Sequence, residues 1–120
     1  SILVMQFLPD NGEKQKYLHE ISKRLRVGAK IIIIDLEGIK YSEAYNILLS
    51  AWKAHQSATR KDKKQIDRDF DHVDKNLEFV PEERLRELLK NAGFSNVHKF
   101  QKSLLFGGYI ATKSRKLVPR

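Results

Sequence analysis

The chain has 120 residues, enough for one domain with one hydrophobic core and too few for two independent domains. Hydrophobic residues make up 41% and charged residues 32% of the sequence, a composition that excludes a disordered chain. The net charge of +8 points toward a nucleic-acid partner, but four of the 23 basic residues lie in the last eight positions, so that residues 1–112 hold 19 basic and 15 acidic residues, a net +4.

Other features of the sequence bear on membrane association, on the cellular compartment and on the C-terminal residues. No apolar run approaches the roughly 18 to 20 residues that cross a bilayer, and no secretory signal pattern is present, so we expect no membrane partner. The absence of cysteine excludes disulfides and cysteine-based zinc sites, and it fits a cytoplasmic protein. The final LVPR, residues 117–120, matches what thrombin leaves at an engineered site, so we interpret it as a tag remnant and assign residues 1–116 to the domain.

The N-terminal third of the sequence predicts a βαβ unit. Residues 1–8 form an apolar run typical of a strand buried on both faces, and the turn formers of Pro9–Gly12 close it. Apolar residues at helical spacing then predict a helix that ends at Gly28. The β-branched run 29–35 predicts a second strand, parallel to the first and joined to it by a right-handed crossover.

The rest of the chain predicts helices followed by a hairpin. Residues 40–77 contain two amphipathic segments, which we interpret as a helical insertion. Pro81 begins a further helix, whose buried stripe is Leu85, Leu88 and Leu89. Two strand-like segments, 97–102 and 104–111, follow and predict a hairpin.

Several segments resemble, in order and spacing, the second half of class I S-adenosylmethionine-dependent methyltransferases. VMQFLPD followed by EKQKYLHEISKRLRVGAKIIIIDLEG resembles the family's fourth strand, fourth helix and fifth strand. Leu25–Ala29 lies where the family commonly has L-x-P-G-G, with Val27 and Ala29 departing from that motif. LRELLKNAGFSNV resembles the last helix and the entry to strand six, and SLLFGGYIATK resembles strand seven.

The resemblance implies a partial Rossmann-like α/β fold, a mixed sheet of about four strands in the family order four-five-seven-six with helices on both faces. It also implies a parent protein that transfers a methyl group from S-adenosylmethionine to a small-molecule or tRNA acceptor. The family's D/E-x-G-x-G loop, which lets the backbone approach the cofactor, has no match here, and neither has the acidic residue that binds the ribose. We therefore interpret the chain as the C-terminal half of a methyltransferase domain, inactive by itself.

A closer similarity points to a particular branch of the family. The Q-F-L-P turn, the helical insertion and the F-G-G segment are most similar to small enzymes related to carboxy-S-adenosylmethionine synthase, which serves tRNA wobble-uridine modification. That synthase uses an arginine to hold the extra carboxylate. Arg60 and Arg68 are the positional candidates for this role.

Candidate site residues follow from the rule that ligands of open α/β sheets bind beyond the carboxyl ends of the strands. The resemblance assigns cofactor contacts to Met5, Gln6 and Phe7, at the end of the first predicted strand. Asp35 and Glu37 end the next strand. They are expected either to orient the acceptor and act as a general base, or to be solvated residues that cap the next helix.

The insertion supplies a second group of candidates. Tyr45, Trp52 and His55 lie on or near one helical face, and in the family such an insertion covers the acceptor pocket. The alternative is an ordinary aromatic core between two helices. The other histidines show no metal-ligand spacing, so no metal is expected.

A second class of protein stays open at this point, a non-catalytic dimerisation or basic RNA-binding module. The stretch ATRKDKKQIDRDFDHVDK mixes both signs of charge, which favours a solvated helix face over an RNA-binding patch. The apolar strand predicted at residues 1–8 has an unpaired outer edge, so the sequence predicts a homodimer through that edge.

Overall fold

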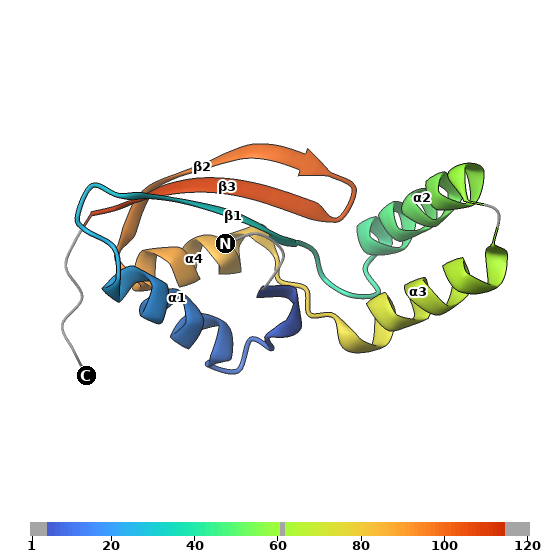
Figure 1. The fold of residues 1–120 in the computed structure, drawn as a ribbon, viewed down its shortest axis with the longest axis horizontal. Helices are drawn as coiled ribbons and strands as arrows, with labels where there is room; N and C mark the ends of the chain where they lie inside the picture. Colours follow the sequence, from blue (N-terminus) through green and yellow to red (C-terminus); the bar gives the residue numbers. More distant parts are fainter. Residues whose placement is uncertain (1–4, 61, 115–120) are drawn as a thin grey trace.

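A three-stranded sheet with helices on one face and a helical hairpin at one end makes up the chain (Figure 1). The computed structural model describes residues 5–60 and 62–114. In chain order, the elements are the 3-10 turn η1 (Met5–Phe7), α1 (Glu13–Lys23), β1 (Lys30–Leu36), α2 (Glu43–Thr59), α3 (Lys63–Asn76), α4 (Glu82–Asn91), β2 (Phe94–Ser103) and β3 (Phe106–Lys113).

The strand order is β1-β3-β2, and the central strand is antiparallel to both neighbours. Ile33 pairs with Tyr109 across one ladder, and Phe94 pairs with Lys113 across the other. Because β3 is antiparallel to each neighbour, β1 and β2 run in the same direction. The predicted C-terminal hairpin is confirmed, and the order agrees with the five-seven-six part of the expected sheet.

The chain turns where the sequence predicts the end of a strand. Met5–Phe7 is a 3-10 turn, so a strand that reaches Leu8 is wrong. The cause is local, because the carbonyl of Met5 accepts two hydrogen bonds, one from the backbone N–H of Leu8 at 3.0 Å and one from the ammonium of Lys14. These bonds take up the carbonyl that a strand would use for pairing. Residues 1–4 lie outside the described part of the chain, so the fourth strand, the parallel crossover and a dimer at that edge are not confirmed.

The main core lies between the sheet and the two helices α1 and α4, which cover the same face (Figure 1). From α1, Leu18 is fully buried, and Leu85, Leu88 and Leu89 form the predicted stripe of α4, all at 0% exposure. Each such side chain contributes about 1.5–3 kcal/mol on burial. Two separate helices thereby hold one face of the sheet.

The two amphipathic helices predicted within residues 40–77 are present, and they form a helical hairpin with its own core. Ser42 caps α2 by accepting the N–H of Tyr45 at 3.1 Å, and Asp62 caps α3 by accepting the N–H of Gln65 at 3.1 Å. The second core cluster consists of Leu36, Tyr45, Val73, Leu77 and Leu105, with partly buried aromatic and leucine side chains around it. The hairpin is therefore attached to the sheet at the carboxyl end of β1.

The two faces of the sheet are not covered alike. The expectation of helices on both faces is not met by the described helices, because α2 and α3 bury their apolar stripes against each other and against the end of the sheet. On the face away from α1 and α4, Ile32 is 46% exposed and Phe100 is 51% exposed. None of the described helices covers this face of the sheet, on which His98 is also exposed opposite Ile110.

Candidate functional site

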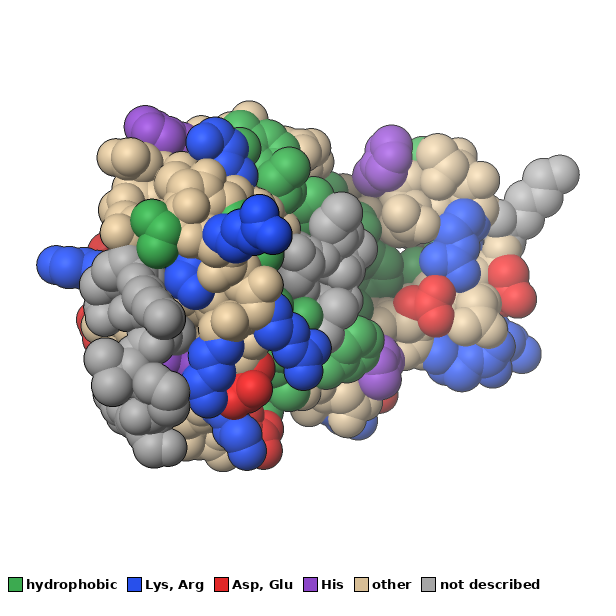
Figure 2. Space-filling view, turned by 60° about the vertical axis from the view of Figure 1, so that its left-hand side comes forward, with side chains coloured by type: hydrophobic (Ala, Val, Ile, Leu, Met, Phe, Trp, Pro, Cys, Tyr) green, Lys and Arg blue, Asp and Glu red, His purple; other side chains and the backbone are tan. Residues whose placement is uncertain are grey.

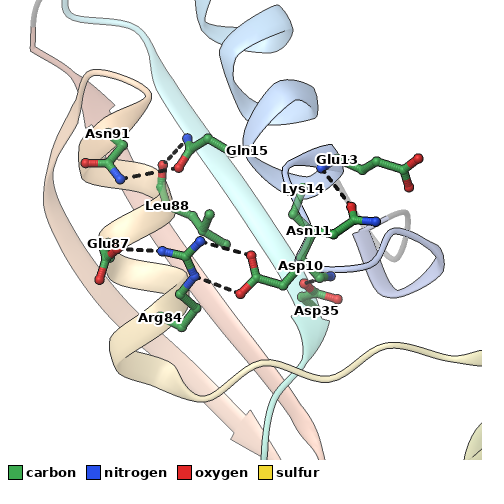
Figure 3. A network of polar contacts seen from close by, with 10 residues as sticks. All are labelled: Asp10, Asn11, Glu13, Lys14, Gln15, Asp35, Arg84, Glu87, Leu88 and Asn91. Atoms are coloured by element: carbon green, nitrogen blue, oxygen red, sulfur yellow. Dashed lines mark hydrogen bonds and ion pairs between the residues drawn. The ribbon is translucent and has the colours of Figure 1, made fainter.

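Three segments meet beside the carboxyl end of β1: the turn before α1, the first turn of α1 and the first half of α4 (Figure 3). The guanidinium of Arg84 donates two hydrogen bonds to Asp10, from Nε to Oδ2 at 2.7 Å and from Nη2 to Oδ1 at 3.0 Å. Hydrogen bonding from Arg84 lowers the pKa of Asp10, and the same bond raises the pKa of Arg84. This bidentate pair fixes the Pro9–Gly12 turn to α4.

A buried ion pair joins α1 to β1 at the same place. Lys14 and Asp35 are both 0% exposed, and Nζ lies 3.3 Å from Oδ2. The second oxygen, Oδ1, accepts the N–H of Leu36 at 2.8 Å, and Lys14 also donates to the carbonyl of Met5. Burial raises the pKa of Asp35, whereas the charge of Lys14 acts in the opposite direction. Because its oxygens are bonded and buried, Asp35 has a structural role in this chain.

Glu37, two residues further along, lies in a different environment. It is 6% exposed, and its Oε2 lies 2.9 Å from the ammonium of Lys99 and 3.0 Å from that of Lys102. Lys99 also lies 2.6 Å from Oε1 of Glu82, and the pKa of Glu82 is lowered chiefly by that bond. Burial works against the charge of Lys99, but bonds to Glu82 and Glu37 raise its pKa. Glu37 is thus a fixed carboxylate between two cations.

Two polar atoms beside this cluster are buried without a hydrogen-bond partner in the described part of the chain: Oε1 of Glu37 and the hydroxyl of Tyr109. Gly107 lies next to both residues, since a Cβ there would be 2.9 Å from Oε1 and 3.1 Å from the Tyr109 ring. Lys99 and Arg86 lie over that ring, 5.5 and 5.7 Å from its centroid. Oε1 of Glu37 thus keeps the capacity to accept a hydrogen bond, but it is buried beside Gly107 and the Tyr109 ring.

The segment that follows β1 is fastened to the end of α3 through Asp74. The hydroxyl of Tyr45 donates to Oδ1 of Asp74 at 3.0 Å, and Lys40 donates to the Asp74 carbonyl at 2.6 Å. Burial, followed by this bond to Asp74, raises the pKa of Tyr45 to about 12. Tyr41, with φ of 68°, is 66% exposed and its ring lies edge-on to that of Tyr45. These contacts hold the hairpin at a fixed place beyond β1.

The remaining predicted site residues are dispersed. Phe7 is 60% exposed at the end of η1, which also contains Gln6, whereas Met5 is buried in the main core. Trp52 packs in the hairpin core, with its ring 5.0 Å from that of Phe70 and 5.2 Å from that of Phe106. His55 is exposed near the far end of α2. Lys14 therefore links Met5 to Asp35, since it bonds both the Met5 carbonyl and the Asp35 carboxylate. Tyr45 and Trp52 lie in the separate core of the hairpin. Ligand binding by any of these residues stays a prediction.

Sequence reasoning missed the polar partners at this site. One of them has a signal: Lys14 precedes Leu18 by four residues and Ile21 by seven, so it belongs to the apolar stripe of α1 and had to be buried. Lys99 and Lys102 gave no such signal, because 62 or more residues separate them from Glu37. Only the pairing of β2 with β3 brings them together.

The described residues show neither a metal site nor a membrane-spanning helix. They contain no group of three or more His, Asp or Glu side chains arranged to hold a metal ion. None of their helices has both the length and the apolar character needed to cross a bilayer.

Comparison with solved structures shows the kind of fold that this site belongs to. Human N-acetylserotonin methyltransferase, in a complex with SAM, matches 95% of this chain with a TM-score of 0.58 and 14% identity, and a possible exported protein from Bordetella parapertussis matches 96% with a TM-score of 0.60 and 16% identity. The chain spans 28% and 38% of the lengths of those two proteins. No family model and no curated protein matches. At these identities the likeness shows a methyltransferase-like α/β fold and no activity.

The Lys14–Asp35 pair gives a first testable prediction. Lys14→Met leaves a buried carboxylate without its cation, so the free energy of unfolding should fall by about 3–5 kcal/mol in urea denaturation. The double variant Lys14→Met/Asp35→Leu should regain most of that loss, because an apolar pair replaces the ionic one. As a control, Lys23→Met breaks an exposed pair with Glu20 and should cost at most about 1 kcal/mol. An equal loss in both single variants would contradict the structural role.

A second prediction compares two adjacent glycines. Gly107→Ala places a Cβ against the Glu37 carboxylate, which two lysines hold, and should lower the free energy of unfolding by about 1–3 kcal/mol. Gly108→Ala places its Cβ against the ring of Phe100, which is half-exposed and free to rotate away, so its cost should be smaller. Thermal unfolding of both variants measures the difference. A larger loss at Gly108 would mean that the Glu37 cluster is not rigid.

Proposed function

We propose that the chain is the C-terminal part of an S-adenosylmethionine-dependent methyltransferase domain, and that the rest of that domain supplies the cofactor-binding loop. The observation that carries the proposal is the fold likeness to a SAM-bound methyltransferase, which extends over 95% of this chain but only 28% of the matched one. A match that includes nearly all of one chain and a fraction of the other is what a part of a larger domain would give.

The topology supports this proposal. The antiparallel strand β3 lies between two strands that run in the same direction, as the resemblance to strands five, seven and six implies. The helical hairpin begins seven residues after β1, beyond the strand end where α/β proteins bind their ligands. Both features, the strand order and the position of the hairpin, are properties of the backbone arrangement. They therefore support the proposal even though the sequence identity to the matched proteins is low.

The described residues do not form a cofactor site by themselves. Met5 is buried and its carbonyl is occupied by Leu8 and Lys14, so of the three predicted contacts only Phe7 is shown exposed. The glycine-rich loop and the ribose-binding acid have no counterpart in the sequence. We therefore derive no methyl-transfer step for this chain alone.

Within the parent protein, Glu37 is the residue of this chain that we propose for acceptor recognition. Its Oε1 has no hydrogen-bond partner among the residues that the structure describes, and the carboxylate lies just beyond the carboxyl end of β1. Because Oε1 is buried, a hydroxyl or amine of the acceptor would supply that hydrogen bond only after the side chains around the oxygen move aside. Asp35, the other acidic candidate, is occupied by Lys14 and is not proposed for this role.

The finer assignment to carboxy-S-adenosylmethionine synthase has no support from the arginines. Arg60 is paired with Asp69 at 2.9 Å, and Arg68 donates to Gln65 at 2.8 Å. Both arginines are thereby bonded within the hairpin rather than directed at a ligand. The proposal is accordingly methyl transfer to an acceptor whose identity stays open.

The alternative of an RNA-binding hairpin is not favoured by its charges. Lys53 pairs with Asp67 at 2.9 Å, and Lys75 pairs with Asp71 at 3.1 Å, in addition to the pair made by Arg60. Cations that are already neutralised attract phosphates weakly. Filter binding with tRNA should therefore be absent or independent of sequence at moderate salt.

Calorimetric titration with S-adenosylmethionine tests the proposed function. The 120-residue chain should show no saturable binding at micromolar concentration, because the loop that approaches the cofactor is missing. The longer protein that contains this chain should bind S-adenosylmethionine saturably, and in it the exposed Glu83→Gln serves as a control for Glu37→Gln. Both variants should retain cofactor binding, and only Glu37→Gln should weaken acceptor use.

Two results would contradict the proposal. Micromolar binding by the short chain would show that it is not an incomplete cofactor site. Absence of binding in the longer protein would remove the methyltransferase assignment altogether.

A further inference from the structure

The net charge of the chain is concentrated in one segment, which runs along α1 and through the loop that leads into β1. Residues 16–30 hold five basic residues and one acidic residue, a net charge of +4. The other residues of 1–112 hold 14 basic and 14 acidic residues and are neutral as a set. Apart from the C-terminal residues, the excess positive charge therefore belongs to a single place in the fold.

Four exposed cations lie on or beside this loop, and we call them the loop cations: Lys23, Arg24, Arg26 and Lys30. Lys23 pairs with Glu20 at 3.2 Å, whereas the other three side chains have no ion-pair or hydrogen-bond partner within the described part of the chain. The remaining described arginines each donate to an acidic or amide side chain, and they are Arg60, Arg68, Arg84 and Arg86. Among the described arginines, Arg24 and Arg26 are therefore the two whose guanidinium groups are open to an external anion.

The segments that meet this loop bring no carboxylate to it. Gly28 donates to the carbonyl of Lys113 at 2.7 Å, and Ser114 donates to the carbonyl of Gly93 at 2.9 Å, so the end of β3 and the junction of α4 with β2 lie beside the loop. The sequence has no acidic residue after Glu87. The left-hand end of Figure 1, where the loop lies, comes forward in Figure 2 and carries a group of Lys and Arg side chains.

The end of α1 does not repel an anion, although the C-terminus of a helix carries a partial negative charge. The ammonium of Lys113, which is 3% exposed, donates to the carbonyls of Ser22 and Leu25, to the second at 2.6 Å. This buried cation thereby neutralises the negative end of the helix. Glu20 is the one acidic residue within residues 16–30, and Lys23 pairs with it. The loop cations therefore dominate the potential outside the loop.

Hydrogen bonds fix the backbone of the loop, so that its cations start from defined positions. The carbonyl of Arg26 accepts the N–H of Ala29 at 3.0 Å across a tight turn, in which Gly28 has a φ of 92° that suits glycine. The N–H of Lys113 donates to the carbonyl of Ala29 at 2.8 Å, which ties this turn to β3. Because the backbone is already ordered, a ligand that binds here has less ordering entropy to offset.

Phosphate is the anion that best fits these side chains. The planar guanidinium group of arginine donates two parallel hydrogen bonds to phosphate oxygens, and Arg24 and Arg26 both have this group free. An acidic membrane surface fits less well, because each Lys or Arg near such a surface contributes only about 1 kcal/mol and stable attachment takes a second, apolar signal. Val27, at 60% exposure, is the one fully exposed apolar side chain with a bulky group in the loop, and it is small.

We propose that the loop cations bind the phosphodiester backbone of a nucleic acid. Contacts to phosphates position a nucleic acid without reading its sequence, so this binding is independent of sequence and falls steeply with salt. The loop lies at the amino end of β1, seven residues or about 20 Å from the candidate site at the carboxyl end. The inference therefore does not depend on the proposed function, and it places nucleic-acid binding on the loop rather than on the helical hairpin.

Fluorescence anisotropy with a labelled DNA duplex of about 20 base pairs, at about 50 to 200 mM salt, tests the proposal on the 120-residue chain. Arg24→Gln/Arg26→Gln should weaken binding by about tenfold or more at the lowest salt and reduce the slope of log K against log salt by about 2. Arg60→Gln/Arg68→Gln removes the same charge from the hairpin, where both arginines are already bonded, and should leave the slope unchanged. The basic C-terminal residues are the same in both variants, so the comparison isolates the loop.

Equal losses in the two double variants would overturn the inference, because net charge alone would then account for binding. Absence of binding by the unaltered chain at the lowest salt would overturn it too, as would a preference of about tenfold or more for one of two duplexes of unrelated sequence. Tighter binding to phosphatidylserine vesicles than to the duplex would assign the loop to a membrane instead. If the double variant does not fold, Lys30→Gln gives the same readout, with a slope reduced by about 1. Failure of the longer protein to bind S-adenosylmethionine would remove the proposed function and leave this inference untouched.

Discussion

The arrangement of this chain depends on the buried ion pair between Lys14 and Asp35. It joins α1 to β1 at 0% exposure, and through the Met5 carbonyl it also holds the turn that precedes α1. Burying two charges is costly unless each is hydrogen-bonded, and here the Leu36 N–H and the Met5 carbonyl supply the additional bonds. Burial still raises the pKa of Asp35, which means that ionising it opposes folding at neutral pH. The pair therefore fixes which way α1 lies against the sheet more than it stabilises the fold.

Two acidic residues that lie two positions apart at the end of β1 have different surroundings. Asp35 lies inside the core, whereas Glu37 directly follows β1. Its Oε2 lies between Lys99 and Lys102, and its Oε1 has no hydrogen-bond partner within the described part of the chain. The hairpin is fastened just beyond, through Asp74. The carboxyl end of β1 thus combines a rigid frame with a buried acceptor oxygen that has no hydrogen-bond partner among the described residues.

The spacing of apolar residues predicted most of the helices and strands, because the buried face of each element recurs at a regular interval in the sequence. The stripe of Leu85, Leu88 and Leu89, the hairpin of β2 and β3, and the two helices of the insertion all follow from it. The strand expected before Pro9 was wrong at Met5–Phe7, since an apolar run does not reveal that its carbonyl is bonded to a lysine nine residues away. For the candidate site, the sequence predicted only where Glu37 lies, from the rule that ligands bind beyond strand ends. The two lysines that pair with Glu37 come from β2, more than 60 residues away, and could not be predicted.

The central claim is that Asp35 is enclosed with Lys14 and is not available to a ligand. A ¹³C NMR titration of the Asp35 side-chain carboxyl tests it in the intact chain. The account predicts a titration midpoint above the ordinary value of 3.8, because desolvation outweighs the attraction of Lys14. A midpoint at the ordinary value of 3.8 that Lys14→Met leaves unchanged would show a solvated carboxylate, and the buried pair on which the arrangement depends would not exist.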